Sequence, residues 1–116
     1  MQKRAFSVVL AELGGLEAVN ARDGHAAGDD LIRTAARALQ QAALHAGATA
    51  CRYGGPRLAM VVPGAEAALA EQLLEQAMAA LPPDAEPRIV GATGRPGEPA
   101  ADVIRRAREA LRAPAL

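Results

Sequence analysis

The chain has 116 residues, of which 51% are apolar, and its thirteen basic side chains balance thirteen acidic ones. This length predicts one domain over residues 1–116 with a single packed core. The neutral charge balance argues against DNA or RNA as partners, because clustered positive charge supplies most of that affinity. Phe6 and Tyr53 are the only aromatic residues, so the stacking surfaces that single-stranded nucleic acid requires are also missing.

The sequence further predicts a cytoplasmic protein with no segment inserted in a membrane. No apolar run approaches the roughly 20 residues that cross a bilayer, and no long apolar stretch follows Met1 as in a secretory signal. Cys51 is the single cysteine, which excludes an internal disulfide and suits a reducing compartment. We expect Cys51 to be a small buried strand residue rather than a nucleophile.

The first half of the chain predicts a strand and two helices. Residues 5–12 form a short β-rich apolar run that is typical of a buried strand. Adjacent glycines break this run, and a short helix is expected over residues 16–23, ending at Gly24. A long helix is expected over residues 26–45, since apolar side chains recur on one face of it, namely Leu31, Ala35, Leu39 and Ala42.

The second half predicts a hairpin, a helix, a strand and a last helix. Residues 48–53 and 57–62 are strand-like and flank Gly54-Gly55, which can adopt the positive φ of a two-residue turn. A helix is expected over residues 65–81, with inward side chains Leu69, Leu73, Leu74, Ala77 and Leu81. A strand over 88–93 and a helix over 100–112 follow, the latter burying Val103, Ile104, Ala107 and Leu111.

The predicted order is β-α-α-β-β-α-β-α. Without the extra short helix over residues 16–23 and the last helix, it is the β-α-β-β-α-β order of ferredoxin-like folds. In that order the sheet is antiparallel with helices packed on one face, so the predicted fold class is α+β, a ferredoxin-like or nucleotidyl-cyclase-like antiparallel sheet with helices. Many unrelated proteins share this arrangement, so it predicts no function by itself.

Four local motifs carry a more specific resemblance. The run from Asn20 to Asp29 reads N-A-R-D-G-H-A-A-G-D, and residues 52–55 read R-Y-G-G. Residues 89–91 read I-V-G, and the last helix contains A-D at residues 101–102. The chain thus resembles the GGDEF (diguanylate-cyclase-like) family, with the patterns N-D-x-x-G-H-x-x-G-D, R-[YF]-G-G, S-I-G and A-D-x-A-L in the same order.

The resemblance implies a metal-assisted phosphoryl transfer in which two GTP molecules are condensed into cyclic di-GMP, each half of a dimer holding one GTP. In the family, carboxylates from D-[IL]-D-x-F and from G-G-[DE]-E-F hold the metal and help to activate the attacking hydroxyl. The corresponding stretches here read E-L-G-G-L at residues 12–16 and G-G-P-R-L at residues 54–58.

These departures predict a degenerate domain without catalytic residues. Glu12 keeps a carboxylate on a longer arm, whereas Gly14 replaces the second acid of the first motif. Pro56 supplies no ligand, and Arg57 puts a positive charge where the family has an acid. We expect no metal site beyond a vestigial Glu12, and weak or lost binding of Mg²⁺ and GTP. The degenerate signature motif is Gly54, Gly55, Pro56, Arg57 and Leu58.

The neighbouring strands suggest a contact within this degenerate site. The strand ending at Glu12 should lie antiparallel to the strand opened by Arg57, so we expect the two side chains to form an ion pair. Residues 45–48 read H-A-G-A where the family has the R-x-x-D of its product-inhibition site, so we expect no cyclic di-GMP binding there. The basic stretch and the first helix of the family are also missing, which suggests a domain cut from a longer protein, although a stand-alone domain remains an alternative.

Other residues have two interpretations. By resemblance, Asn20 and Asp29 match the guanine contacts of the family and would form a vestigial pocket. Asp29 alternatively lies in the first turn of the long helix, where a carboxylate suits the helix dipole. Gly24, His25 and Gly28 are interpreted as a tight corner between helices. Four arginines of the last helix form a solvated face or a site for phosphate or an acidic partner: Arg105, Arg106, Arg108 and Arg112.

The leading hypothesis is a catalytically inactive GGDEF-like regulatory or interaction module in cyclic di-GMP signalling. Its partners would be other domains or proteins of that system, with a homodimer as one arrangement. One alternative is a GTP-binding sensor without turnover. The other is a weak diguanylate cyclase.

Overall fold

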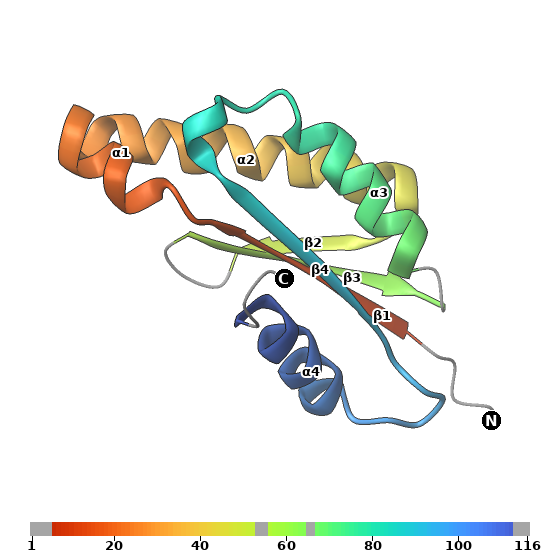
Figure 1. The fold of residues 1–116 in the computed structure, drawn as a ribbon. Coiled ribbons are helices and arrows are strands. Elements are labelled where there is room, and N and C mark those ends of the chain that lie inside the picture. Colours follow the sequence, from red (N-terminus) through yellow and green to blue (C-terminus); the bar gives the residue numbers. More distant parts are fainter. Residues whose placement is uncertain (1–5, 53–55, 65–66, 113–116) are drawn as a thin grey trace.

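The computed structural model describes residues 6–52, 56–64 and 67–112. These residues form an antiparallel sheet with helices on both faces (Figure 1). The strands are β1 (Phe6–Leu13), β2 (Thr49–Arg52), β3 (Arg57–Pro63) and β4 (Pro87–Thr93), in the spatial order β2-β3-β1-β4. The helices are α1 (Leu16–Asp23), α2 (His25–Ala46), α3 (Ala67–Met78) and α4 (Ala100–Arg112), with a short 3₁₀ helix, η1 (Pro83–Ala85).

The predicted α+β fold and its element order are confirmed. The helices over 16–23 and 100–112 have their predicted bounds, and most other described ends differ by one residue. The helix expected to continue to Leu81 stops at Met78. The turn at Gly54-Gly55, Tyr53, and the side chain of Cys51 lie outside the part of the chain that the structure describes.

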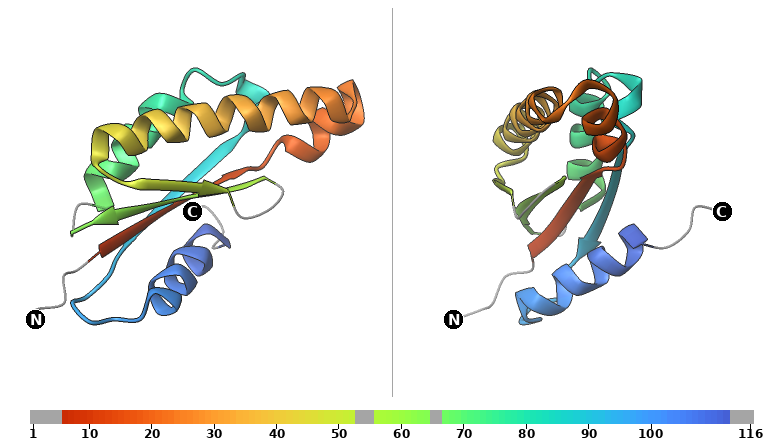
Figure 2. Two further views of the ribbon diagram at one scale, coloured as in Figure 1. Left: turned by 180° about the vertical axis from the view of Figure 1, so that it is seen from behind. Right: turned by 90° about the vertical axis from the view of Figure 1, so that its left-hand side faces the viewer.

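The helices of the predicted ferredoxin-like order pack on one face of the sheet, and the last helix, α4, which that order leaves out, packs on the other. Helices α1, α2 and α3 cover one face, and α4 alone packs against the other (Figure 2). The reason lies in β1, which is buried on both sides: Val9 and Ala11 face the three-helix layer, whereas Val8 and Leu10 face α4. A strand without polar alternation needs cover on both faces.

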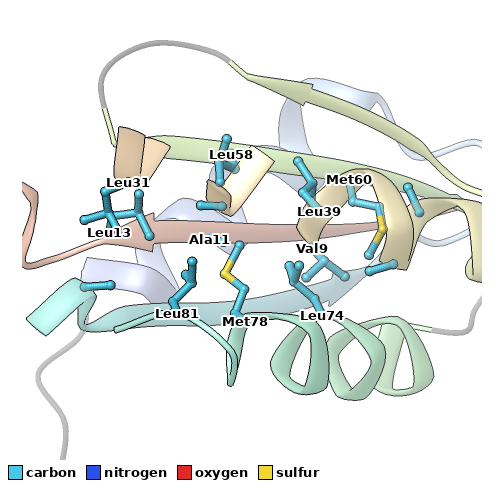
Figure 3. Close-up of a cluster of buried hydrophobic side chains, with 14 of the residues drawn as sticks. Val9, Ala11, Leu13, Leu31, Leu39, Leu58, Met60, Leu74, Met78 and Leu81 are labelled. Carbon is cyan, nitrogen blue, oxygen red and sulfur yellow. The ribbon is translucent and has the colours of Figure 1, made fainter. Parts of the chain in front are cut away.

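The larger core lies between the sheet and the pair α2–α3 (Figure 3). The predicted inward face of α2 is confirmed, since its four apolar residues are all buried: Leu31, Ala35, Leu39 and Ala42. Of the side chains expected to point inward from the third helix, Leu74 and Leu81 are buried, and Leu73 and Ala77 are partly buried against the core. The buried residues of α3 also include Ala67, Ala70 and Met78. Leu69, which was expected inside, is 52% exposed.

Candidate functional site

A hollow of about 280 Å³ lies where β1 ends and α1 begins. It brings together Glu12, Asn20 and Pro56, three of the residues that the sequence singled out. Its described lining consists of Glu12, Leu13, Gly14, Leu16, Glu17, Asn20 and Pro56. Two acidic side chains and one amide therefore surround a small, otherwise apolar space.

The loop that forms this hollow is fixed by backbone hydrogen bonds. The N–H of Leu13 donates to the carbonyl of Pro56, and the N–H of Gly14 donates to the carbonyl of Glu86, both at 3.0 Å. The N–H of Gly15 donates to the carbonyl of Ala85, also at 3.0 Å. The segment around η1 therefore holds the entry to α1, a contact that the sequence analysis missed. Its only sequence signal was the Pro82-Pro83 pair, since proline is favoured where such a helix starts.

Gly15 shows how close this contact is. A Cβ built on Gly15 would lie 1.8 Å from the carbonyl oxygen of Asp84. The backbone φ of Gly15 is −91°, which any residue can adopt, so the requirement for glycine is purely one of space.

Asn20 points its amide into the helix corner. Its Oδ1 is the one buried side-chain oxygen or nitrogen in the described residues without a hydrogen-bond partner. A Cβ built on Gly28 would lie 1.7 Å from this oxygen, so Gly28 makes room for the amide. Gly24, with φ of 91°, turns the chain between α1 and α2, which confirms the interpretation of these glycines as a tight corner. His25 is exposed at the start of α2.

Asp29 is not part of this arrangement. It is exposed and lines a separate surface hollow with Ile32, Arg33 and Ala36. Its predicted place in the first turn of the long helix is wrong, because α2 begins at His25 and its first turn holds no acidic residue. The N–H groups that lack an acceptor within the helix belong to the first turn, which ends before Asp29.

Glu12 is flanked by two arginines in the sheet register. It lies directly opposite Arg57 on β3 and opposite Arg88 on β4. All three side chains belong to the α4 side of the sheet, because Leu10, two residues earlier, packs in the α4 cluster. The expected register is therefore confirmed, but the expected ion pair is wrong: Glu12 and Arg57 are not within 4.0 Å. Arg57 is exposed, and a solvated pair contributes only about 0 to 1 kcal/mol against the entropy of two long side chains.

The residues around the hollow do not fit a divalent metal. Of the acid positions that the resemblance implies, Glu12 alone carries a carboxylate. In the described ranges, no group of three His, Cys, Asp or Glu side chains could hold a metal ion. The positive charge of Arg57 opposite Glu12 further disfavours a second cation.

Charged contacts elsewhere join elements together. Arg22 of α1 contacts Asp23 and Asp84, and its hydrogen bond holds the pKa of Asp23 below the usual range. Glu98 accepts from the backbone N–H of Arg95 and from Arg106, and these bonds lower its pKa. The α4 arginines are all exposed, as a solvated face requires, although Arg105 pairs with Asp102 and Arg106 with Glu98.

No helix in the described residues is long and apolar enough to cross a membrane.

Comparisons with known proteins match almost the whole chain. A family model described as "Diguanylate cyclase, GGDEF domain" matches residues 1–114. The diguanylate cyclase VdcA of Vibrio cholerae is 35% identical over 69 residues, which cover 60% of this chain and 20% of that protein. The chain thus matches about a fifth of the length of this relative.

Solved structures show the same fold. The GGDEF domain of DgcB from Caulobacter crescentus, in complex with c-di-GMP, matches 93% of this chain and 70% of its own with a TM-score of 0.75 and 23% identity. The diguanylate cyclase SiaD of Pseudomonas aeruginosa, in complex with its activator SiaC, matches 93% of this chain and 45% of its own, with a TM-score of 0.80 and 19% identity.

Proposed function

Because the chain belongs to the GGDEF domain family, we propose that it is a catalytically inactive regulatory or interaction module of cyclic di-GMP signalling. The observation that carries this proposal is the identity of three residues: Gly14 and Pro56, which line the hollow, and Arg57, which lies opposite Glu12 in the sheet. Gly14 and Pro56 offer no ligand to a metal, and Arg57 offers a positive charge.

The chemistry of the family explains why these residues matter. Phosphoryl transfer depends on positioning and on cations that neutralise the charge of the triphosphate. With Glu12 alone at the metal positions, no such cation is held against the nucleotide. Each ~1.4 kcal/mol of lost transition-state stabilisation slows the reaction tenfold. Two acids replaced by Gly14 and Pro56, and a third replaced by the positively charged Arg57, therefore suffice to abolish turnover.

The partners that we propose are other domains or proteins of a cyclic di-GMP system in the cytoplasm. The SiaD structure holds an activator protein, which supports protein contacts as a means of regulation in this fold. A homodimer is one arrangement of such a module, since the family reaction requires two domains.

The test is incubation of the purified chain with GTP and either Mg²⁺ or Mn²⁺. We expect no cyclic di-GMP above a no-protein control by chromatography, with an active diguanylate cyclase as the positive control. The double substitution Pro56→Asp and Arg57→Glu should not restore full activity, because Gly14 still lacks its carboxylate. Product formed by the unaltered chain would show that the module is an enzyme.

A second candidate function is favoured by Asn20. Its buried Oδ1 lacks a donor, and an unpaired buried acceptor costs about 1–3 kcal/mol. Asn20 also lines the hollow, so a nucleobase N–H bound there would supply the donor if the amide turned out of the helix corner, which supports a GTP sensor without turnover. In the same samples, heat of GTP binding without product supports the sensor, whereas the absence of both favours a module that acts through protein contacts alone.

A further inference from the structure

We propose that Arg57 takes the place of the divalent metal and directly binds the polyphosphate chain of a nucleotide, so that binding needs no metal and is opposed by Glu12. This inference rests on the second candidate function, GTP binding without turnover. It starts from the mismatch between the hollow and a metal ion, since one carboxylate and one guanidinium stand where two acidic motifs are expected.

The position of Arg57 allows this role, although Arg57 does not itself line the hollow. It is the first residue of β3 and directly follows Pro56, which does line it. It also lies directly opposite Glu12, which lines the same hollow. Cβ atoms of directly opposed strand residues are about 4.5–5.5 Å apart, and an arginine side chain is long enough to reach across that distance.

Arg57 is also available for a ligand. Its side chain is exposed and makes no hydrogen bond or ion pair in the described structure. By contrast, Arg22, Arg33 and Arg106 each bind a carboxylate within the chain. A guanidinium presents a planar set of donors that matches two phosphate oxygens at once. Arg88, on the other side of Glu12, adds positive charge while making a contact of its own.

Glu12 makes the proposal distinguishable from ordinary metal-dependent binding. In a metal site a carboxylate strengthens nucleotide binding, because it holds the cation that bridges to the phosphates. When arginine binds the phosphates directly, the same carboxylate repels them and competes for the guanidinium. Removing the charge of Glu12 therefore weakens binding in the first case and strengthens it in the second.

The experiment is calorimetric titration of the full chain with GTP and with inorganic tripolyphosphate, each in EDTA and in Mg²⁺. We expect GTP to bind in EDTA and to bind no more tightly with Mg²⁺, which reduces the negative charge of the phosphates. Arg57→Ala should weaken binding of both compounds about tenfold, or about 1.4 kcal/mol, because it removes a charge-assisted contact to phosphate. Glu12→Gln should tighten GTP binding severalfold.

The matched control is Arg37→Ala, which removes an equally exposed arginine from α2 on the other face of the sheet. It should leave both affinities unchanged, and the thermal unfolding of all variants should show that exposed substitutions keep the fold. A requirement for Mg²⁺, weaker binding in Glu12→Gln, or unchanged binding in Arg57→Ala would each overturn the proposal. Failure of both compounds to bind would overturn it as well, while leaving the predicted lack of turnover intact.

Discussion

At the scale of single residues, Gly14 and Gly15 differ sharply although they are adjacent. Neither has a positive φ, so their difference is one of space. A Cβ on Gly15 would meet the Asp84 carbonyl oxygen at 1.8 Å, whereas on Gly14 the nearest atom, the Glu86 carbonyl oxygen, would be 3.2 Å away. The segment around η1 thus leaves no space for a side chain at Gly15, whereas at Gly14 a methyl group would make only a close contact.

The first prediction at this scale concerns Gly15→Ala. We expect it to lower the free energy of unfolding by about 1–3 kcal/mol or more, because the added methyl group forces the backbone near Asp84 to move. Gly14→Ala serves as the control. Its expected change is within about 1 kcal/mol, since its milder contact is offset by the lower entropy of the unfolded chain. Urea denaturation measures both, and equal losses in the two variants would contradict the steric explanation.

At the scale of elements, the helices differ in how well their sequences predicted their faces. In α2 the side opposite the predicted apolar face carries Arg33, Arg37 and Gln40, so helical spacing selected the buried face directly. In α3 leucine and alanine occupy nearly every side, and Leu69, Leu73 and Leu74 cannot all face the core. The choice among them is made by tertiary contacts with β1 and β4, which the sequence pattern does not contain.

The prediction for α3 compares two leucines of the same helix. Leu74 is fully buried and Leu69 is 52% exposed. Leu74→Ala should cost about 2–5 kcal/mol of unfolding free energy through lost burial and the cavity left behind. Leu69→Ala should stay within about 0.5 kcal/mol of the unaltered chain. Chemical denaturation measures both changes. A larger loss of unfolding free energy in Leu69→Ala than in Leu74→Ala would contradict the burial of the Leu74 side of α3.

Some features of the candidate site were predictable from the sequence and others were not. The hollow with Glu12, Asn20 and Pro56 could be located from the sequence, because each motif lies next to a strand or helix end that the family resemblance places together. The position of Asp29 failed because one residue at the start of α2 decides which turn it occupies. The Glu12–Arg57 ion pair failed because register fixes where two backbones meet, whereas solvent decides how exposed side chains lie.

At the scale of the whole molecule, ion pairs link the two helical layers to the rest of the chain. Arg22 joins α1 to η1 in the three-helix layer, through Asp84. Glu98 and Arg106 join the loop after β4 to α4 on the other face. Asp23 and Glu98 have pKa values below their ordinary ones, so both carboxylates are more easily ionised in the folded chain.

The pH prediction follows from the sign of these shifts. A lowered pKa contributes stability that is present above the unfolded pKa, about 4 for these groups, and is lost as the pH falls through the folded pKa. The melting temperature should therefore decrease as the pH falls below about 4. Glu98→Gln should melt slightly lower at pH 7, and its difference from the unaltered chain should vanish in acid. The effect is small because the pair is partly exposed.

The control for this series is Glu75→Gln, an exposed glutamate of α3. It should leave the gap between neutral and acid melting temperatures unchanged. If the melting temperature of Glu98→Gln instead fell in acid by as much as that of the unaltered chain, the contact between Glu98 and its two donors would not contribute to the pH dependence of stability.

The central position of β1 has a consequence for the order in which the protein forms. β1 is the first strand of the chain, yet its two sheet partners, β3 and β4, come later, and a long helix is made before either. Val8 and Leu10 lie on the face of β1 that packs against α4. During synthesis this face therefore stays uncovered until α4, the last described element, has been made. Such distant pairings are slow to form, because a long loop must close before any contact rewards it. The strand that holds the sheet together thus stays exposed in a nascent chain until β3, β4 and α4 have been made, whereas the helices α1 and α2 can pack against each other early.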